Sequence, residues 1–161
     1  MNKTIRTIPS KYILFSLAVI TSMVLAGIAS ADPEGPGVQT VVKGSVDEAL
    51  TSLTKMVADN GMMIMGELHQ GKVLEMTGLK VKSESVFVGN PTIGKKLFTL
   101  APGAGLAVPV RVNIYEDSHG RTVFAYVPLS QQLASFNNPQ INEIAAMVDG
   151  KLAKMAEMLA K

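Results

Sequence analysis

Apolar residues spaced three and four positions apart predict a helix over residues 46–59. Ser45 and Glu48 precede this stripe at the spacing of a capping box, in which hydroxyl and carboxylate satisfy two backbone amides reciprocally. Asn60-Gly61 follows the stripe, and glycine is the usual left-handed residue after a helix. The residues expected on the buried face are Val46, Leu50, Leu53 and Val57.

A second helix is expected at the C-terminal end, where Asn138 is a suitable N-cap and Pro139 suits the first helical position. Its apolar stripe continues almost to the end of the chain. The stripe consists of Ile141, Ile144, Ala145, Val148, Leu152, Ala156 and Leu159.

Shorter signals lie between these two helices. We expect strands over 38–43, 62–68 and 85–88, a short helix over 70–76 and a loop over 101–105. A further helix is expected to begin at Pro91, with Asn90 as its cap.

The strongest strand signal is a hairpin of residues 108–116 and 121–127, joined by the turn residues Asp117-Ser118-His119-Gly120. If Glu116 faces Arg121, one face is apolar throughout: Val110, Val112, Ile114, Val123, Ala125 and Val127. The other face then carries Arg111, Asn113, Tyr115, Phe124 and Tyr126. We expect this second set to form a dimer surface or the wall of a ligand cleft, because such side chains are enriched where proteins bind. An ordinary solvated face with scattered aromatic residues is the alternative.

Interleaved helix and strand signals indicate an α+β fold, with a mainly antiparallel sheet and helices packed on one face. The apolar face of the hairpin is expected to pack against Leu50, Leu53, Val57, Ile144, Val148 and Leu152.

The first 31 residues have the three-part layout of a secretory signal peptide. Lys3, Arg6 and Lys11 precede an apolar run over 12–28, and Ala29-Ser30-Ala31 is a small-residue cleavage site. We expect cleavage before Asp32 and a periplasmic or secreted protein. An uncleaved membrane anchor is the alternative, since the run is near the lower length of a span. Residues 32–39 then form a flexible lead, and residues 40–161 form a single domain.

Composition narrows the classes of function. The chain has 161 residues and no cysteine, which excludes disulfides, thiol catalysis and covalently attached c-type haem. Three of its 15 basic residues lie in the first 31 positions, so the rest carries 12 basic and 13 acidic residues, a net charge of −1. Nucleic-acid binding needs a basic stripe, and none is present. We expect no nucleic-acid partner, and no membrane partner after signal cleavage.

Two motifs resemble a known family. The run from Val86 to Gly94, VFVGNPTIG, is similar to its apolar–Gly-Asn-Pro-x-x-Gly centre. The run from Gly105 to Asp117, GLAVPVRVNIYED, is similar to its Gly-Leu-x-Leu-Pro…Glu-Asp strand, and Phe124-Ala125-Tyr126 resembles the strand that follows. Over about residues 40–160 the chain resembles the domain-of-unknown-function 302 family (DUF302). The resemblance implies a small α+β domain, often a homodimer and sometimes behind a signal peptide, with no agreed activity.

His69 stands where many members of that family carry an Asp-His pair, but Leu68 precedes it here. Strand alternation would place Glu67 on the same face as His69, where the two would form a ligand site or an acid–base pair. A structural histidine at a strand end is the alternative.

A second candidate ligand site consists of Gly89, Asn90 and Gly94. Free amides at this helix start would favour an anion or a carbonyl group. A rigid strand-to-helix corner is the alternative.

Methionine is unusually frequent, with ten residues. On a regular strand, Met63 and Met65 would share a face with Glu67 and His69. Soft thioethers and an imidazole are suitable for copper, and His69 could also ligate a non-covalent haem. Gap-filling in the core is the simpler interpretation of the methionines.

We find no catalytic constellation, so enzymatic activity is uncertain and disfavoured. The sequence favours an exported, non-catalytic ligand-binding or interaction module, acting as a homodimer and without a cofactor. Tentative ligand-binding residues are His69, Glu67, Gly89, Asn90, Gly94, Arg111, Tyr115 and Tyr126. The alternative is a copper- or haem-handling protein that uses His69 with Met63 and Met65.

Overall fold

A five-stranded antiparallel sheet forms the centre of the domain, with strand order β1-β5-β4-β3-β2. The computed structural model describes residues 36–161; residues 1–35, with the expected signal peptide, lie outside that range. The strands are β1 (Val38–Val42), β2 (Met63–Leu68), β3 (Ser83–Gly89), β4 (Val110–Glu116) and β5 (Thr122–Tyr126). β1 therefore begins two residues inside the expected lead.

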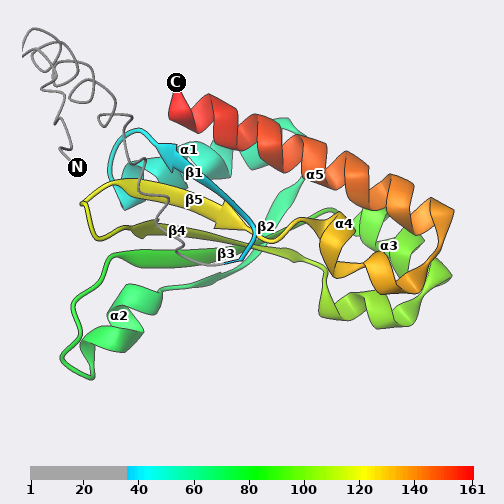
Figure 1. Cartoon of the computed structure of the whole chain (residues 1–161), viewed down its shortest axis with the longest axis horizontal. Helices are drawn as coiled ribbons and strands as arrows, with labels where there is room; N and C mark the ends of the chain where they lie inside the picture. The colour runs from blue at the N-terminus through cyan, green and yellow to red at the C-terminus, as the bar shows by residue number, and fades with distance from the viewer. Residues whose placement is uncertain (1–35) are drawn as a thin grey trace, which may run out of the picture. The chain divides into compact units, whose positions relative to one another are not determined.

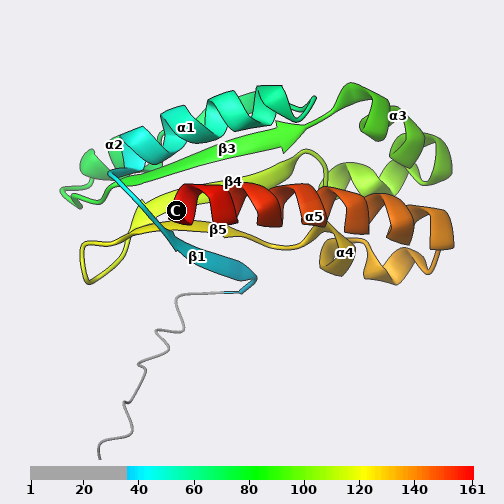
Figure 2. The same cartoon turned by 90° about the horizontal axis from the view of Figure 1, so that it is seen from above.

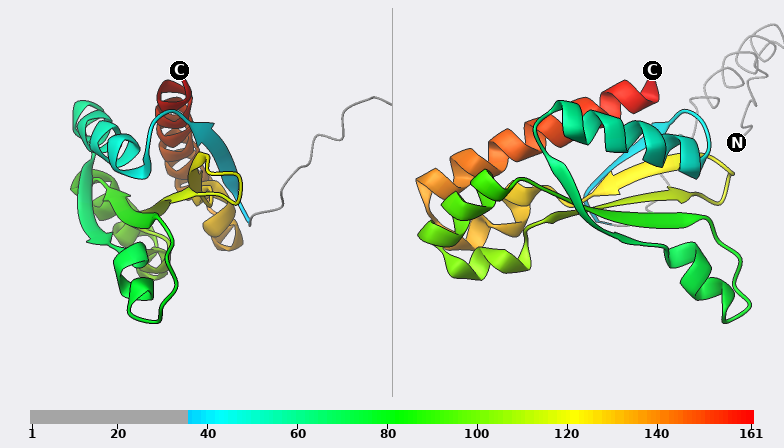
Figure 3. Two further views of the ribbon diagram at one scale, coloured as in Figure 1. Left: turned by 90° about the vertical axis from the view of Figure 1, so that its left-hand side faces the viewer. Right: turned by 180° about the vertical axis from the view of Figure 1, so that it is seen from behind.

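Helices connect and cover these strands. They are α1 (Val46–Asp59), α2 (Gln70–Glu75), α3 (Pro91–Leu100), α4 (Leu129–Gln132) and α5 (Pro139–Ala160), with 3₁₀ turns η2 (Pro102–Leu106) and η3 (Ala134–Phe136). The long helices α1 and α5 lie on one face of the sheet, and α2 lies on the other side (Figures 1 and 3). Seen from above, α3 and α4 gather at one end with the start of α5 (Figure 2). This arrangement confirms the α+β class.

The helix caps predicted for α1 and α5 are confirmed. Glu48 Oε2 accepts from the Ser45 amide at 2.8 Å, and Ser45 Oγ accepts from the Glu48 amide at 3.3 Å. The backbone hydrogen bond from Ser45 lowers the pKa of Glu48 below its ordinary value. Both α1 and α5 begin at the expected residues because each cap depends only on neighbours within one helical turn.

The register of the hairpin differs from the expected one by a single residue. Glu116 pairs with Thr122 rather than Arg121, so Ile114 lies opposite Phe124 and Val112 opposite Tyr126. The reason is Asp117, whose amide donates to Arg121 O at 2.9 Å and whose carboxylate accepts from the Arg121 amide at 2.8 Å. Asp117 and Arg121 thus close the ladder and leave only three residues in the turn.

That shift exchanges the two faces of β5, so the expected surface patch is wrong in part. Phe124 and Tyr126 belong to the core with Val112 and Ile114, while Val123 and Ala125 lie on the face of Asn113 and Tyr115. The rings of Phe124 and Tyr126 pack edge to face with centroids 5.8 Å apart.

The core lies between the sheet and the pair α1 and α5. Leu53, Val57, Val148 and Leu152 are buried in it as expected, while Leu50 and Ile144 are partly buried against it. No helix among residues 36–161 is long and apolar enough to cross a bilayer. Residues 36–161 contain this core and belong to one compact unit.

We expect Phe124→Ala to lower the free energy of unfolding by about 3–5 kcal/mol, because it empties a fully buried aromatic site. Val41→Ala on the exposed face of β1 is the control, with an expected loss below about 1 kcal/mol. Urea unfolding followed by circular dichroism measures both. A loss below about 1 kcal/mol for Phe124→Ala would contradict the observed register.

Candidate functional site

A cavity of about 260 Å³ opens where β3 passes into α3. It brings together Gly89, Asn90 and Gly94, three of the candidate residues. The remaining lining residues are Met62, Met65, Val88, Pro91, Ile93, Phe98, Val108, Pro109, Val110, Leu129 and Val148. None of the lining side chains is ionisable, so the cavity is an apolar space.

Asn90 fixes the corner above this cavity. Its Oδ1 accepts from the Ile93 amide at 2.9 Å, and its Nδ2 donates to Gly61 O at 2.5 Å, which ties the corner to the end of α1. The Gly94 amide donates to Asn90 O at 2.8 Å, and Pro91 has no amide hydrogen. The helix-start amides expected to attract an anion are therefore largely engaged, so the corner acts as a rigid wall.

Met65 lies at the edge of the cavity. A β-bulge at Met65 shifts the pairing of β2 with β3, and the half-exposed side chain lies against Gly89. A Cβ at position 89 would come within 2.6 Å of Met65 Sδ and 3.3 Å of Pro109 Cβ. Gly89 is thus required for the close approach of this thioether.

The same bulge separates the candidate metal ligands. Met63 pairs with Gly89 and Glu67 pairs with Val86, and these two β3 residues lie on opposite faces of the sheet. The expectation that Met63 and Met65 share a face with Glu67 and His69 is therefore wrong. One extra residue in β2 reverses the phase of alternation between Met63 and Glu67.

His69 has a carboxylate partner, but it is Glu84 rather than Glu67. His69 Nδ1 lies 2.6 Å from Glu84 Oε2, with the imidazole half-exposed and the carboxylate mostly buried. The contact spans fifteen residues, so only the pairing of β2 with β3 reveals it. An oriented imidazole is a usable ligand or base, yet His69 does not line the apolar cavity.

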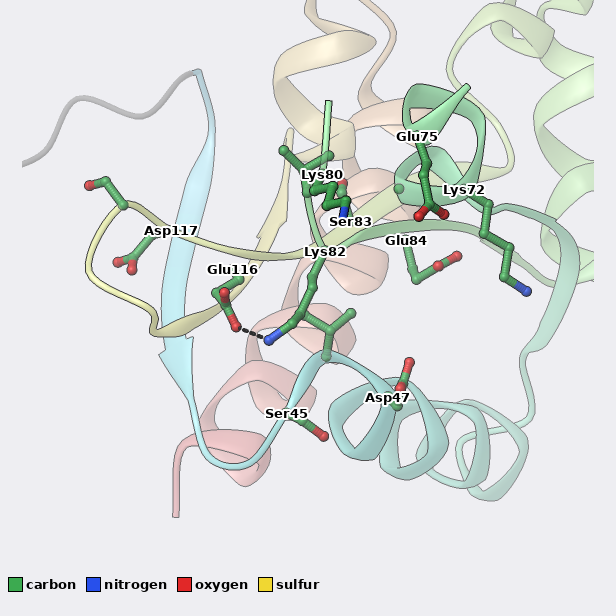
Figure 4. A pocket seen from close by; sticks show the side chains of 14 residues that line it. Ser45, Asp47, Lys72, Glu75, Lys80, Lys82, Ser83, Glu84, Glu116 and Asp117 are labelled. Carbon is green, nitrogen blue, oxygen red and sulfur yellow. Dashed lines mark hydrogen bonds and ion pairs between the residues drawn. The ribbon is translucent and has the colours of Figure 1, made fainter. Parts of the chain in front are cut away.

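A separate polar cleft of about 820 Å³ lies between the start of α1, α2 and the β4–β5 turn (Figure 4). Several of its charges neutralise each other: Lys82 Nζ contacts Glu116 Oε2 at 2.7 Å, and Arg121 Nε contacts Asp117 Oδ2 at 2.6 Å. Burial alone would raise the pKa of Asp117, but hydrogen bonds from Arg121 and His119 hold it below its ordinary value.

No group of three or more potential metal-ligating His, Cys, Asp or Glu side chains occurs within residues 36–161.

The remaining candidates are dispersed over the sheet. Arg111 Nε donates to the buried Ser85 Oγ at 3.1 Å, and Tyr115 OH donates to Gln39 Oε1 at 3.4 Å, both on the face away from α1 and α5. Tyr126 lies on the opposite, buried face, where burial and then the charge of Asp149 raise its pKa. These three residues therefore do not form one site.

Comparisons with known proteins agree with this fold. A family model described as domain of unknown function DUF302 matches residues 38–159. A crystal structure titled as an uncharacterized conserved protein DUF302 from Bacillus stearothermophilus is similar, with a TM-score of 0.71 and 18% identity. The similarity covers 76% of this chain and 96% of that chain, and at this identity it shows the fold alone. No curated protein matches the chain.

Gly89→Ala tests the contact between Gly89 and Met65. We expect it to lower the free energy of unfolding by about 1–3 kcal/mol, because the new methyl group displaces the thioether. In a Met65→Ala background the same substitution should cost less, since its main obstacle is gone. Urea unfolding of the four proteins measures this coupling, and equal costs in both backgrounds would refute the contact.

Proposed function

We propose that this chain, which belongs to the DUF302 family, is an exported, non-catalytic module that binds a small apolar ligand in the cavity at the β3–α3 corner. The observation that carries the proposal is the cavity itself, which combines an apolar lining with a wall held by the hydrogen bonds of Asn90. Ligand sites in proteins are typically concave and mostly apolar.

The lining indicates the class of ligand. An uncharged ligand is favoured because none of the lining side chains is ionisable, and the polar ends of Asn90 are already engaged. A cavity of about 150 Å³ accommodates benzene. The cavity of about 260 Å³ therefore suits one or two fused aromatic rings or a short acyl chain.

The geometry supports binding rather than catalysis. The His69–Glu84 pair is not part of the cavity lining, so it does not face a bound apolar molecule. The copper alternative is less favoured, because the bulge in β2 places Met63 on the opposite face of the strand from Glu67 and the His69 side. We therefore do not carry that alternative further.

Export rests on the sequence of the first 31 residues. N-terminal sequencing of the protein from the periplasm or medium should begin at Asp32, and a membrane-bound chain beginning at Met1 would contradict cleavage. Homodimerisation also stays a prediction, and analytical ultracentrifugation of the exported chain tests it.

Gly94→Leu tests the cavity. A Cβ at Gly94 meets no atom within 4 Å, so leucine fits at the helix surface and fills part of the cavity. We expect naphthalene to shift the ¹³C-methyl NMR signals of Met62 and Met65 in the wild-type protein, and to lose this effect in the variant.

The matched control is Gly150→Leu, because Gly150 is also helical, meets no atom within 4 Å and lies outside the cavity. It should bind naphthalene as the wild type does, and thermal melting should show both variants folded. Unchanged Met62 and Met65 signals in the wild type, or equal binding by both variants, would overturn the proposal.

A further inference from the structure

Two of the large side chains that line the cavity are also exposed to solvent. Phe98 is 47% exposed and Met65 is 50% exposed, and both belong to the lining. A side chain that contacts a cavity on one side and solvent on the other forms the barrier between them. Pro91 is exposed as well, but its ring is closed on the backbone and cannot swing aside. The cavity therefore opens to solvent past Phe98 or past Met65.

Met65 is held closely at its edge of the cavity. Its Sδ would lie 2.6 Å from a Cβ at Gly89, so the thioether lies directly against the bare backbone of β3. The bulge that positions Met65 is fixed by the pairing of β2 with β3 on both sides of it. Met65 therefore acts as a wall rather than as a movable barrier.

The ring of Phe98 lies with its tip against the η2 turn, at the end of the domain where α3 and α4 gather (Figure 2). A Cβ at Gly105 would lie 2.9 Å from Phe98 Cζ and 3.2 Å from its Cε1, so the tip contacts the turn where no side chain projects. The next residue, Leu106, is 98% exposed, so this part of η2 lies at the surface. The contact with Gly105 therefore holds the tip of the ring between the cavity and solvent.

Empty space lies beside this ring on α3. Gly94 comes one helical turn before Phe98, and both residues line the cavity. A Cβ at Gly94 would meet no atom within 4 Å. Because side chains on a helix lean toward its N-terminus, the ring of Phe98 can tilt over Gly94 without displacing another side chain.

We propose that Phe98 is the gate of the cavity. Its ring closes the entrance when the tip lies against Gly105, and it opens the entrance when the ring tilts toward Gly94. Exposed side chains change rotamer within nanoseconds, so this gate needs no movement of the backbone.

The gate also determines which apolar molecules are bound. The ring occupies one wall of the cavity, so it limits the width of a ligand and favours naphthalene over a substituted, bulkier naphthalene. This selection of ligand width rests on the proposed function, whereas the gate itself rests only on the geometry of Phe98.

Hydrogen peroxide tests the gate without any ligand. It transfers one oxygen atom to a methionine sulfur, which gives the sulfoxide and water, at a rate that depends on access to the sulfur. Met62 lines the cavity and is 7% exposed. Met155 is 1% exposed in the core and does not line the cavity, so it serves as an internal reference. Mass spectrometry of peptides measures both oxidation rates in the same sample of the protein as isolated.

Phe98→Ala should raise the oxidation rate of Met62, relative to that of Met155, about tenfold, because the entrance then stays open. Phe136→Ala is the matched control: Phe136 is 37% exposed and its ring lies 3.5 Å from a Cβ at Gly103 in the same turn, but it does not line the cavity. The control should leave the ratio of the two rates as in the wild type. Equal ratios in the two variants would overturn the gate.

Two further variants keep the result unambiguous. Met65→Ala should raise the ratio less than Phe98→Ala does, and a larger rise would overturn the proposal by placing the entrance at β2. Phe98→Leu removes the ring but keeps an apolar side chain on α3, so it replaces Phe98→Ala if thermal melting shows that the alanine variant is unfolded.

The dye prodan tests the selection of ligand width. It is an uncharged naphthalene with two bulky substituents, and its fluorescence shifts to shorter wavelength in apolar surroundings. We expect Phe98→Ala to bind prodan about tenfold more tightly than the wild type does, and Phe136→Ala to bind it as the wild type does. Equal affinity of the wild type and Phe98→Ala for prodan would refute the selection.

The gate and the proposed function fail separately. A wild-type protein that binds neither naphthalene nor prodan would refute the ligand cavity and the selection of width, while the oxidation ratios would still decide on the gate. Binding of naphthalene together with equal oxidation ratios in Phe98→Ala and Phe136→Ala would refute the gate alone.

Discussion

Asp117 determines which face of the hairpin is buried. Its carboxylate accepts from the His119 amide at 2.9 Å, the Arg121 amide at 2.8 Å and Arg121 Nε at 2.6 Å. Because side chains alternate along a strand, this closure commits Phe124 and Tyr126 to the core beside Val112 and Ile114. The edge strand β1 pairs with β5, so the alternation of side chains along β1 follows that of β5.

A second phase shift, the bulge at Met65, shapes the candidate site. It moves Met65 against Gly89 and leaves Glu67 on the other face from Met63. In a regular strand, the Met63 and Met65 thioethers would lie beside His69. In the bulged strand, the Met65 thioether lies at the edge of an apolar cavity. Of Met63, Met65, Glu67 and His69, only Met65 lines the apolar cavity.

Features that depend on contacts between residues close in the sequence were predicted correctly. Features that depend on tertiary contacts were not. The caps at Ser45, Asn90 and Asn138 are local, and the helices that they begin were correctly predicted. The hairpin register depends on whether Asp117 belongs to the turn or pairs with Arg121 at the end of the strand ladder. The residue types alone do not distinguish these two arrangements. The partner of His69 and the four-residue α4 depend on tertiary contacts, and neither was predicted.

The segment between β2 and β3 contains α2, which has no buried residue. Its attachments are mainly polar: Gln70 Oε1 accepts from Ser83 Oγ and Ser85 Oγ at 3.1 and 3.0 Å, and His69 contacts Glu84. Little apolar area holds it, so opening it costs far less than unfolding the sheet. Its backbone amides should exchange with solvent through local openings, and the stability of the domain is largely decoupled from the length and sequence of this connection.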